Sequence, residues 1–186
     1  MALAAIGVVI VVVAIVVATS QPAGRSGATA WPADPPGLQR RLEAAGLQVL
    51  TAEGQVQHTH QHLDLFVDGA RVTVAAGIGI DTTAGIIAPI HTHDATGIIH
   101  VESPVVRDFT LGQVFDVWGV KFDAHCLGDT CDGNGRVLSV FVNGQPVTGD
   151  PRALVLQSHL EIVVAIGTTA QLPSPLPSSY QFPAGY

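Results

Sequence analysis

Residues 57–74 decide the fold, and they read Gln-His-Thr-His-Gln-His-Leu-Asp-Leu-Phe-Val-Asp-Gly-Ala-Arg-Val-Thr-Val. Leu63, Leu65 and Val67 recur at every second position of this run. Successive side chains of a strand point to opposite faces, so this period predicts a strand with one apolar face. Asp68-Gly69 is typical of a two-residue hairpin turn, after which residues 71–74 would form the returning strand.

The same period places His58, His60 and His62 on the other face of the predicted strand. Imidazole is the commonest side-chain ligand of transition metals in proteins. Three imidazoles along one face of a strand therefore indicate a metal site.

A second histidine cluster occupies residues 91–94, which read His-Thr-His-Asp. If residues 94–97 form a four-residue turn, His91 pairs with His100, and His93 lies opposite Ile98. Glu102 lies two residues beyond His100 on the same face. The turn sets this arrangement, because a one-residue change of register would move His100 and Glu102 to the opposite face.

Each of these polar residues receives a predicted role. Asp64 and Asp94 are expected to orient histidines, although Asp94 also suits a turn-capping role and Asp64 a place at the surface. Glu102 is a ligand, a general base or a solvated charge. His125 and His159 are isolated in the sequence and fit structural roles better. The predicted metal ligands are His58, His60, His62, His91, His93 and His100, which suit two sites, one dinuclear site or one mononuclear site.

The remaining pattern predicts one short entrance helix, one packed helix and several further strands. The entrance helix spans residues 37–46, and the packed helix spans 110–118 with Thr110 as its N-cap. The predicted strands are 47–50, 86–90, 98–101, a hairpin at 137–147 and a final strand at 160–165. This order predicts a β-dominated α+β fold with a mixed or antiparallel sheet and one packed helix, similar to a β-grasp. The alternative is a small β-sandwich or barrel.

The N-terminus differs in composition from the rest of the chain. Residues 2–18 carry no polar or charged side chain, which predicts a transmembrane signal anchor over 1–18, with a cleaved signal peptide as the alternative. Residues 19–36 predict a flexible tether, 37–171 a single globular metal-binding domain, and 172–186 an extended proline-rich tail. The domain is expected on the extracytoplasmic side of the cell membrane, or secreted.

Charge and cysteine content narrow the possible partners. The formal net charge is −7, and Lys121 is the only lysine, so binding to nucleic acid is disfavoured. Cys126 and Cys131 enclose four residues, and in an oxidising compartment they are expected to form a disulfide. The alternative is a pair of thiolate ligands beside His125.

Two resemblances follow from these motifs. The segments beginning at His58, His91 and Phe109, together with the ending Pro-Ser-Ser-Tyr-Gln-Phe-Pro, resemble a group of uncharacterised bacterial His-rich proteins, membrane-anchored or secreted, over most of residues 46–186. That resemblance implies a single-domain unit and no activity. Gly85 followed by His91-x-His93 also resembles the opening of the first cupin motif. The glutamate of that motif is missing, so membership of the cupins is not assigned.

The sequence leaves three functions open. The first is an extracytoplasmic protein that binds a divalent transition metal, copper or zinc, through its histidines. The second is a metal-dependent hydrolase or oxidoreductase with an open coordination position and Glu102 as base. The third is a structural or interaction module with an unknown protein partner. Met1 is the only methionine, so a methionine-based copper(I) carrier is excluded.

Overall fold

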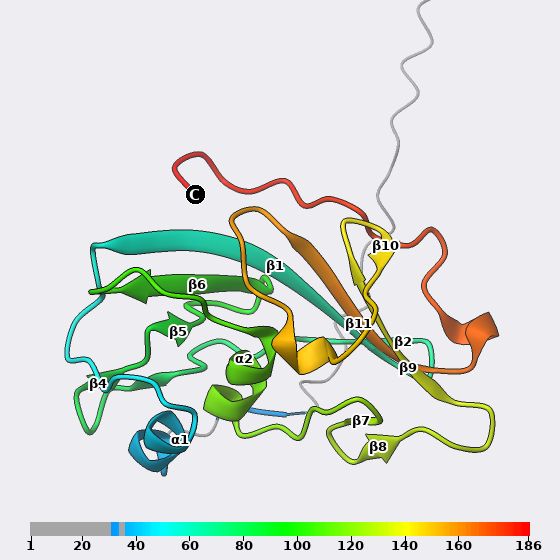
Figure 1. Cartoon of the computed structure of the whole chain (residues 1–186), viewed down its shortest axis with the longest axis horizontal. Helices are drawn as coiled ribbons and strands as arrows, with labels where there is room; N and C mark the ends of the chain where they lie inside the picture. Colours follow the sequence, from blue (N-terminus) through cyan, green and yellow to red (C-terminus); the bar gives the residue numbers. More distant parts are fainter. Residues whose placement is uncertain (1–30, 34–35) are drawn as a thin grey trace, which may run out of the picture.

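The computed structural model describes residues 31–33 and 36–186, and its main feature is a seven-stranded mixed sheet (Figure 1). The sheet order is β10-β9-β11-β1-β6-β5, and β2 also pairs with β1. These strands are β1 (Gln57–Val67), β2 (Ala70–Val72), β5 (Ile90–His91), β6 (Ile98–Ser103), β9 (Val137–Val142), β10 (Gln145–Pro146) and β11 (Glu161–Gly167). Two small hairpins lie outside it: β3 (Ile80–Asp81) with β4 (Ile86–Ile87), and β7 (Cys126–Leu127) with β8 (Thr130–Cys131).

Strand β1 is central because it pairs along both of its edges. On one edge, its first half is antiparallel to β6 and its last three residues are antiparallel to β2. On the other edge, residues 62–67 run parallel to β11. The predicted hairpin is therefore confirmed, although its returning strand covers Ala70–Val72 rather than residues 71–74.

The two helices, α1 (Leu38–Ala44) and α2 (Leu111–Trp118), pack against each other. The hydroxyl of Thr110 accepts a hydrogen bond from the backbone N–H of Gln113, and the side-chain oxygen of Gln113 accepts one from the backbone N–H of Thr110, so the two residues form a capping box. Gly119 ends α2 with φ +81°, a conformation that glycine adopts without strain. Phe115 and Trp118 of α2 lie in the core with Leu63 and other apolar residues of the sheet.

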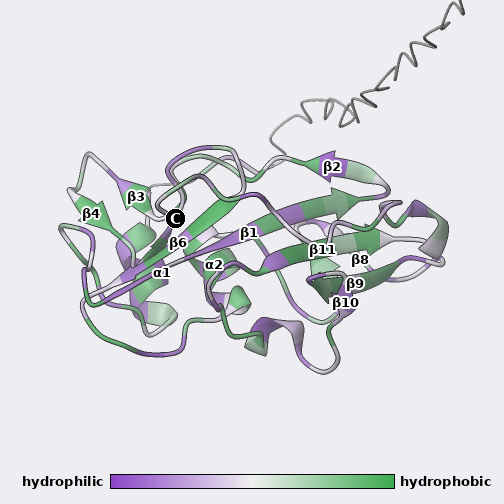
Figure 2. Ribbon diagram, turned by 90° about the horizontal axis from the view of Figure 1, so that it is seen from above, coloured by the Kyte–Doolittle hydropathy of each residue, from purple (hydrophilic) through white to green (hydrophobic). Residues whose placement is uncertain are grey.

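The sheet has two chemically different faces. Leu63 and Leu65 are fully buried in the core, whereas His60, His62 and Asp64 lie at the alternate positions of β1. Figure 1 shows the two helices on one side of the sheet and the C-terminal segment on the other. Figure 2 shows hydrophobic colour over much of β6 and β11, and hydrophilic colour at the start of β1. One face of β1 thus builds the core, and the other presents histidines.

The predicted fold class is confirmed as α+β and β-dominated with a mixed sheet, with three local corrections. Two helices pack into the fold rather than one, because Leu38 and Leu42 of α1 are buried. The predicted strand at 47–50 is wrong, since only Leu50 forms a bridge, to Ile87. The predicted strand at 86–90 is divided between β4 and β5, which pair with different partners.

The structure describes the predicted C-terminal tail but little of the predicted N-terminal segments. The transmembrane segment 1–18 lies outside the described residues, as does most of the tether 19–36. Within residues 31–33 and 36–186, no helix is both long and apolar enough to cross a bilayer. Residues 173–186 form no helix or strand and run along the sheet (Figure 1).

Candidate metal centre

Strand pairing brings the two histidine clusters together in one row across the sheet. His60 of β1 pairs with His100 of β6, and His100 pairs with His91 of β5. The pairing of His91 with His100 is the one that the predicted turn at residues 94–97 requires. In the adjacent row His58 pairs with Glu102. The two clusters therefore form one histidine cluster, which comprises His58, His60, His91, His93 and His100.

Within this cluster, the ring nitrogens of each His-x-His pair lie close together. The Nε2 atoms of His58 and His60 are 3.2 Å apart, and those of His91 and His93 are 3.3 Å apart. His91 donates its Nδ1–H to the carbonyl of Ala88 at 3.0 Å, so its neutral ring presents the Nε2 lone pair to the cluster. Two ligand nitrogens on a tetrahedral zinc ion, each about 2.05 Å from the metal, lie about 3.3 Å apart.

Glu102 lies between the two pairs and is almost completely buried, at 2% exposure. Its Oε1 atom is 3.3 Å from His58 Nε2 and 3.0 Å from His100 Nδ1. Its Oε2 atom is buried without a hydrogen-bond partner. Burying a carboxylate oxygen without a partner costs folding free energy. This unpaired oxygen therefore indicates that the surrounding residues could hold a cation.

Burial keeps the inner histidines of the cluster neutral. It lowers the pKa of His60 to about 4 and that of His100 to about 3, and repulsion from neighbouring histidines adds to both shifts. The pKa of His91 is likewise lowered to about 4, mainly by burial. Burial and the neighbouring carboxylate of Glu53 raise the pKa of Glu102. At neutral pH, the three inner imidazoles therefore offer lone pairs rather than positive charge.

These shifts predict that the metal-free protein loses stability in acid. His60, His91 and His100 take up protons near pH 6.5 when unfolded, but only near pH 3–4 when folded. Between these values the unfolded state binds more protons, so the free energy of unfolding falls as pH falls. Each histidine contributes up to about 1.4 kcal/mol per pH unit, and the raised pKa of Glu102 offsets part of this.

Thermal unfolding of the metal-free protein, followed by circular dichroism, measures this effect. We expect a lower midpoint at pH 4.5 than at pH 7. A midpoint that stays constant over this range would contradict the prediction.

His62 lies apart from the cluster, in a group with Asp64 and Glu161. Its Nδ1 is 2.7 Å from Glu161 Oε2, and its Nε2 donates to the carbonyl of Thr96 at 3.0 Å. Both ring nitrogens are thus used in hydrogen bonds. Asp64, expected to orient a histidine, is 3.9 Å from His62 and forms an ion pair with Arg71. The structure thus brings five of the six predicted ligands together. The sixth, His62, lies outside this cluster, and its role as a ligand stays a prediction.

The other predicted residues lie outside the cluster. Asp94 accepts hydrogen bonds from the backbone N–H and the hydroxyl of Thr96. It therefore caps the turn, which is one of the two roles predicted for it. These hydrogen bonds lower its pKa. Cys126 and Cys131 form the predicted disulfide, which removes the thiolate alternative. The exposed ring of His125 pairs with Asp132 at 2.6 Å.

The C-terminal segment covers part of the histidine face. The ring of Tyr186 lies 4.4 Å from that of His60, centroid to centroid, and 5.4 Å from that of His100. Tyr180 stacks on His62 at 3.7 Å with an interplanar angle of 7°. His159 Nε2 donates to the carbonyl of Tyr186 at 3.0 Å, so His159 holds the covering segment rather than joining the cluster.

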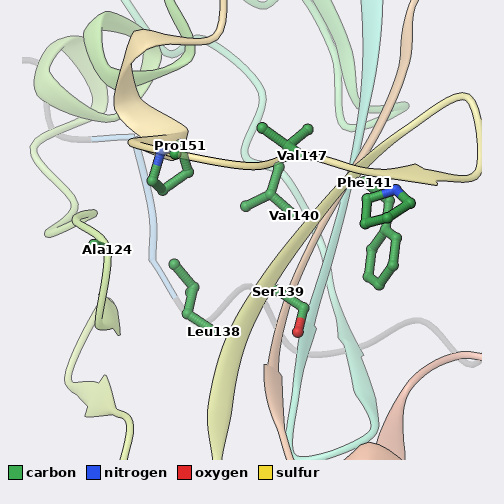
Figure 3. A pocket seen from close by; sticks show the side chains of 9 residues that line it. Ala124, Leu138, Ser139, Val140, Phe141, Val147 and Pro151 are labelled. Carbon is green, nitrogen blue, oxygen red and sulfur yellow. The ribbon is translucent and has the colours of Figure 1, made fainter.

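A separate cavity of about 210 Å³ lies beside β9 (Figure 3). Leu138, Val140, Val147 and Pro151 give it an apolar lining, and Ser139 is the polar side chain labelled there. Its lining contains no imidazole or carboxylate, so it adds no ligand to the metal centre.

Sequence reasoning missed Glu53, Glu161 and the two tyrosines. Glu53 Oε1 is 3.5 Å from His93 Nε2, and Glu161 is paired with His62. A signal for Glu161 did exist, because it is the one charged residue in the apolar run of residues 160–166. Glu53 and the tyrosines carried no such signal, since nothing in their local sequence indicates where their segments lie.

No family model, curated protein or solved structure matches the chain. The chemistry of the site therefore rests on its own geometry. Neutral imidazoles with one buried carboxylate form a donor set that suits a divalent transition metal.

Proposed function

We propose that this protein binds a divalent transition metal, copper or zinc, through the histidine cluster and Glu102. The observation that carries the proposal is the placement of His58 and His60, and of His91 and His93, with their Nε2 atoms at the spacing of ligands on one ion. The unpartnered Oε2 of Glu102 beside them supports it.

Metal identity follows from the donor types. The cluster offers imidazole and carboxylate, while both cysteines are held in a disulfide and the chain has one methionine, Met1. This set favours Cu(II) and Zn(II) over Cu(I), Ca²⁺ and Mg²⁺. Glu102 is buried and hydrogen-bonded to His100, which suits a ligand better than a base that must reach substrate. Binding is therefore favoured over catalysis.

The test uses the full chain purified without a polyhistidine tag. The protein is stripped with a chelator, dialysed against Zn²⁺ or Cu²⁺, desalted and analysed for bound metal. We expect at least one ion per chain in the wild type and in His125→Ala, which removes an exposed histidine outside the cluster. Substoichiometric metal in the wild type would refute the proposal.

We also propose that the domain stands on the extracytoplasmic side of a membrane. The apolar run at residues 2–18 supports an anchor, and the Cys126–Cys131 disulfide fits an oxidising compartment. Recovery of the full chain in membranes after carbonate extraction tests the anchor, and release into the soluble fraction would refute it.

The fold itself we propose to be β-grasp-like. The order β2-β1-β11-β9-β10, with β1 parallel to β11 and antiparallel to β2, supports this. Helix α2 lies between β2 and β9 in the chain, and so does the segment that carries β5 and β6. In this description, the segment from β5 to β6 is an insertion that extends the sheet beside β1 and supplies His91, His93, His100 and Glu102.

A further inference from the structure

The histidine cluster contains two overlapping ligand sets rather than one. In the first set, His58 and His60 are joined by His100 and Glu102, and in the second, His91 and His93 are joined by the same two residues. Within each set, one ligand atom from every residue lies within 4.8 Å of the others. The two His-x-His pairs belong to different sets.

The size of one ion limits how far apart its ligand atoms can lie. Two ligand atoms on opposite sides of a zinc or copper ion are about 4.2 Å apart, which is the largest separation around one ion. Each His-x-His pair satisfies this limit by itself, with 3.2 Å and 3.3 Å between its nitrogens. Among the described residues, no set with all ligand atoms within 4.8 Å of one another contains both pairs, so one ion cannot bind all four imidazoles in this arrangement. We therefore expect each pair to hold its own ion.

Glu102 is placed to serve both pairs. Its Oε1 atom is 3.3 Å from His58 Nε2 in the first pair and 3.9 Å from His91 Nε2 in the second. A carboxylate has two oxygens with free lone pairs, and Oε2 has no hydrogen-bond partner in the fold. Oε1 accepts a hydrogen bond from His100 and keeps a further lone pair, and Oε2 is unpaired, so this one buried side chain can offer an oxygen to each of two ions.

The surroundings give each pair one inner and one outer histidine. His60 and His91 are buried, whereas the side chains of His58 and His93 are 48% and 43% exposed. Glu53, close to His93, adds a second carboxylate on that side of the cluster. The exposed histidines leave each pair accessible to an incoming ion from solvent.

We propose that the centre is dinuclear, with His58 and His60 on one divalent ion, His91 and His93 on a second, and Glu102 bridging the two. This inference rests on the proposed function and adds to it the number of ions and their linkage.

The test is Cu²⁺ titration of the tag-free full chain, with bound metal and electron paramagnetic resonance measured on the same samples. We expect two ions per chain and a half-field signal from interacting Cu²⁺ pairs. Glu102→Gln should abolish the half-field signal, and His125→Ala should leave both readings unchanged.

Matched variants assign the two ions separately. His58→Ala and His93→Ala each remove one half-exposed imidazole, so both should fold, as circular dichroism would verify. Each should weaken one of the two binding steps by about 10-fold or more and leave the other step near its wild-type value. If both variants weakened the same step, the assignment of one pair to each ion would be overturned.

The outcomes separate this inference from the proposed function. One ion per chain in the wild type, or two ions without a half-field signal, would overturn the dinuclear centre and leave metal binding intact. Failure of the wild type to bind any ion would refute both.

Discussion

His100→Ala should lower the affinity of the protein for Zn²⁺ or Cu²⁺ by about 100-fold or more. His100 is the one histidine that both ligand sets share, and its ring lies 4.6 Å from that of His60 and 4.4 Å from that of His93, centroid to centroid. It also holds Glu102 through Nδ1 at 3.0 Å. Its loss therefore removes a candidate ligand and releases the carboxylate, whose orientation alone is worth about 10–100-fold in such sites.

Isothermal titration of metal-free protein measures this effect. His125→Ala serves as the matched control, since it removes a solvent-exposed imidazole that pairs with Asp132 and belongs to neither ligand set. His100 is buried, so His100→Gln is the second variant, because it keeps most of the side-chain volume. If both His100 variants fold and bind metal with wild-type affinity, the central role of His100 is wrong.

Glu161→Ala should destabilise the protein by on the order of 3 kcal/mol. Glu161 is 1% exposed, and its Oε2 lies 2.7 Å from Nδ1 of the equally buried His62. Removing the carboxylate leaves the buried imidazole without its hydrogen-bond acceptor. Because an unpaired polar group is costly to bury, the folded state becomes less stable relative to the unfolded state. Urea unfolding of the metal-free protein, followed by circular dichroism, measures the change.

A double-mutant cycle separates pairing from loss of packing. His62→Leu combined with Glu161→Met replaces both polar groups with apolar ones of similar size. We expect the double variant to be more stable than the sum of the two single changes predicts, because neither polar group remains to be buried alone. Strictly additive losses would show that the pair contributes nothing beyond its packing.

Short-range predictions from the sequence succeeded where one local feature sets the geometry. Thr110 is the N-cap of α2, as its place before the apolar periodic run predicts. The turn at residues 94–97 sets the register of β5 and β6, so the pairing of His91 with His100 follows from local sequence. The disulfide follows from the short separation of its cysteines.

Two errors have a common physical cause. Residues 47–50 and 86–90 are apolar enough for strands, but a strand exists only where a partner edge satisfies its backbone. Leu50 and Ile87 meet in a single bridge, and the chain at residues 88–89 passes from one partner to another. The apolar composition of these segments therefore did not reveal where a partner strand would lie.

By itself, the sequence determined the longer strands and the two helices of this protein, and the face of each strand on which its histidines lie. The period of two residues placed His58, His60 and His62 together, and a four-residue turn returned His100 to His91. Both placements involve residues close together in the chain, and local backbone geometry fixes their relative positions.

Only the tertiary structure decided that the two clusters form one centre and that His62 is separated from it. The antiparallel pairing of β1 with β6 places His60 beside His100, and the parallel pairing of β1 with β11 places Glu161 beside His62. No tight turn joins either pair of strands, so no local signal sets their register. The packing of the whole core sets this register, and the composition of the candidate metal centre follows from it.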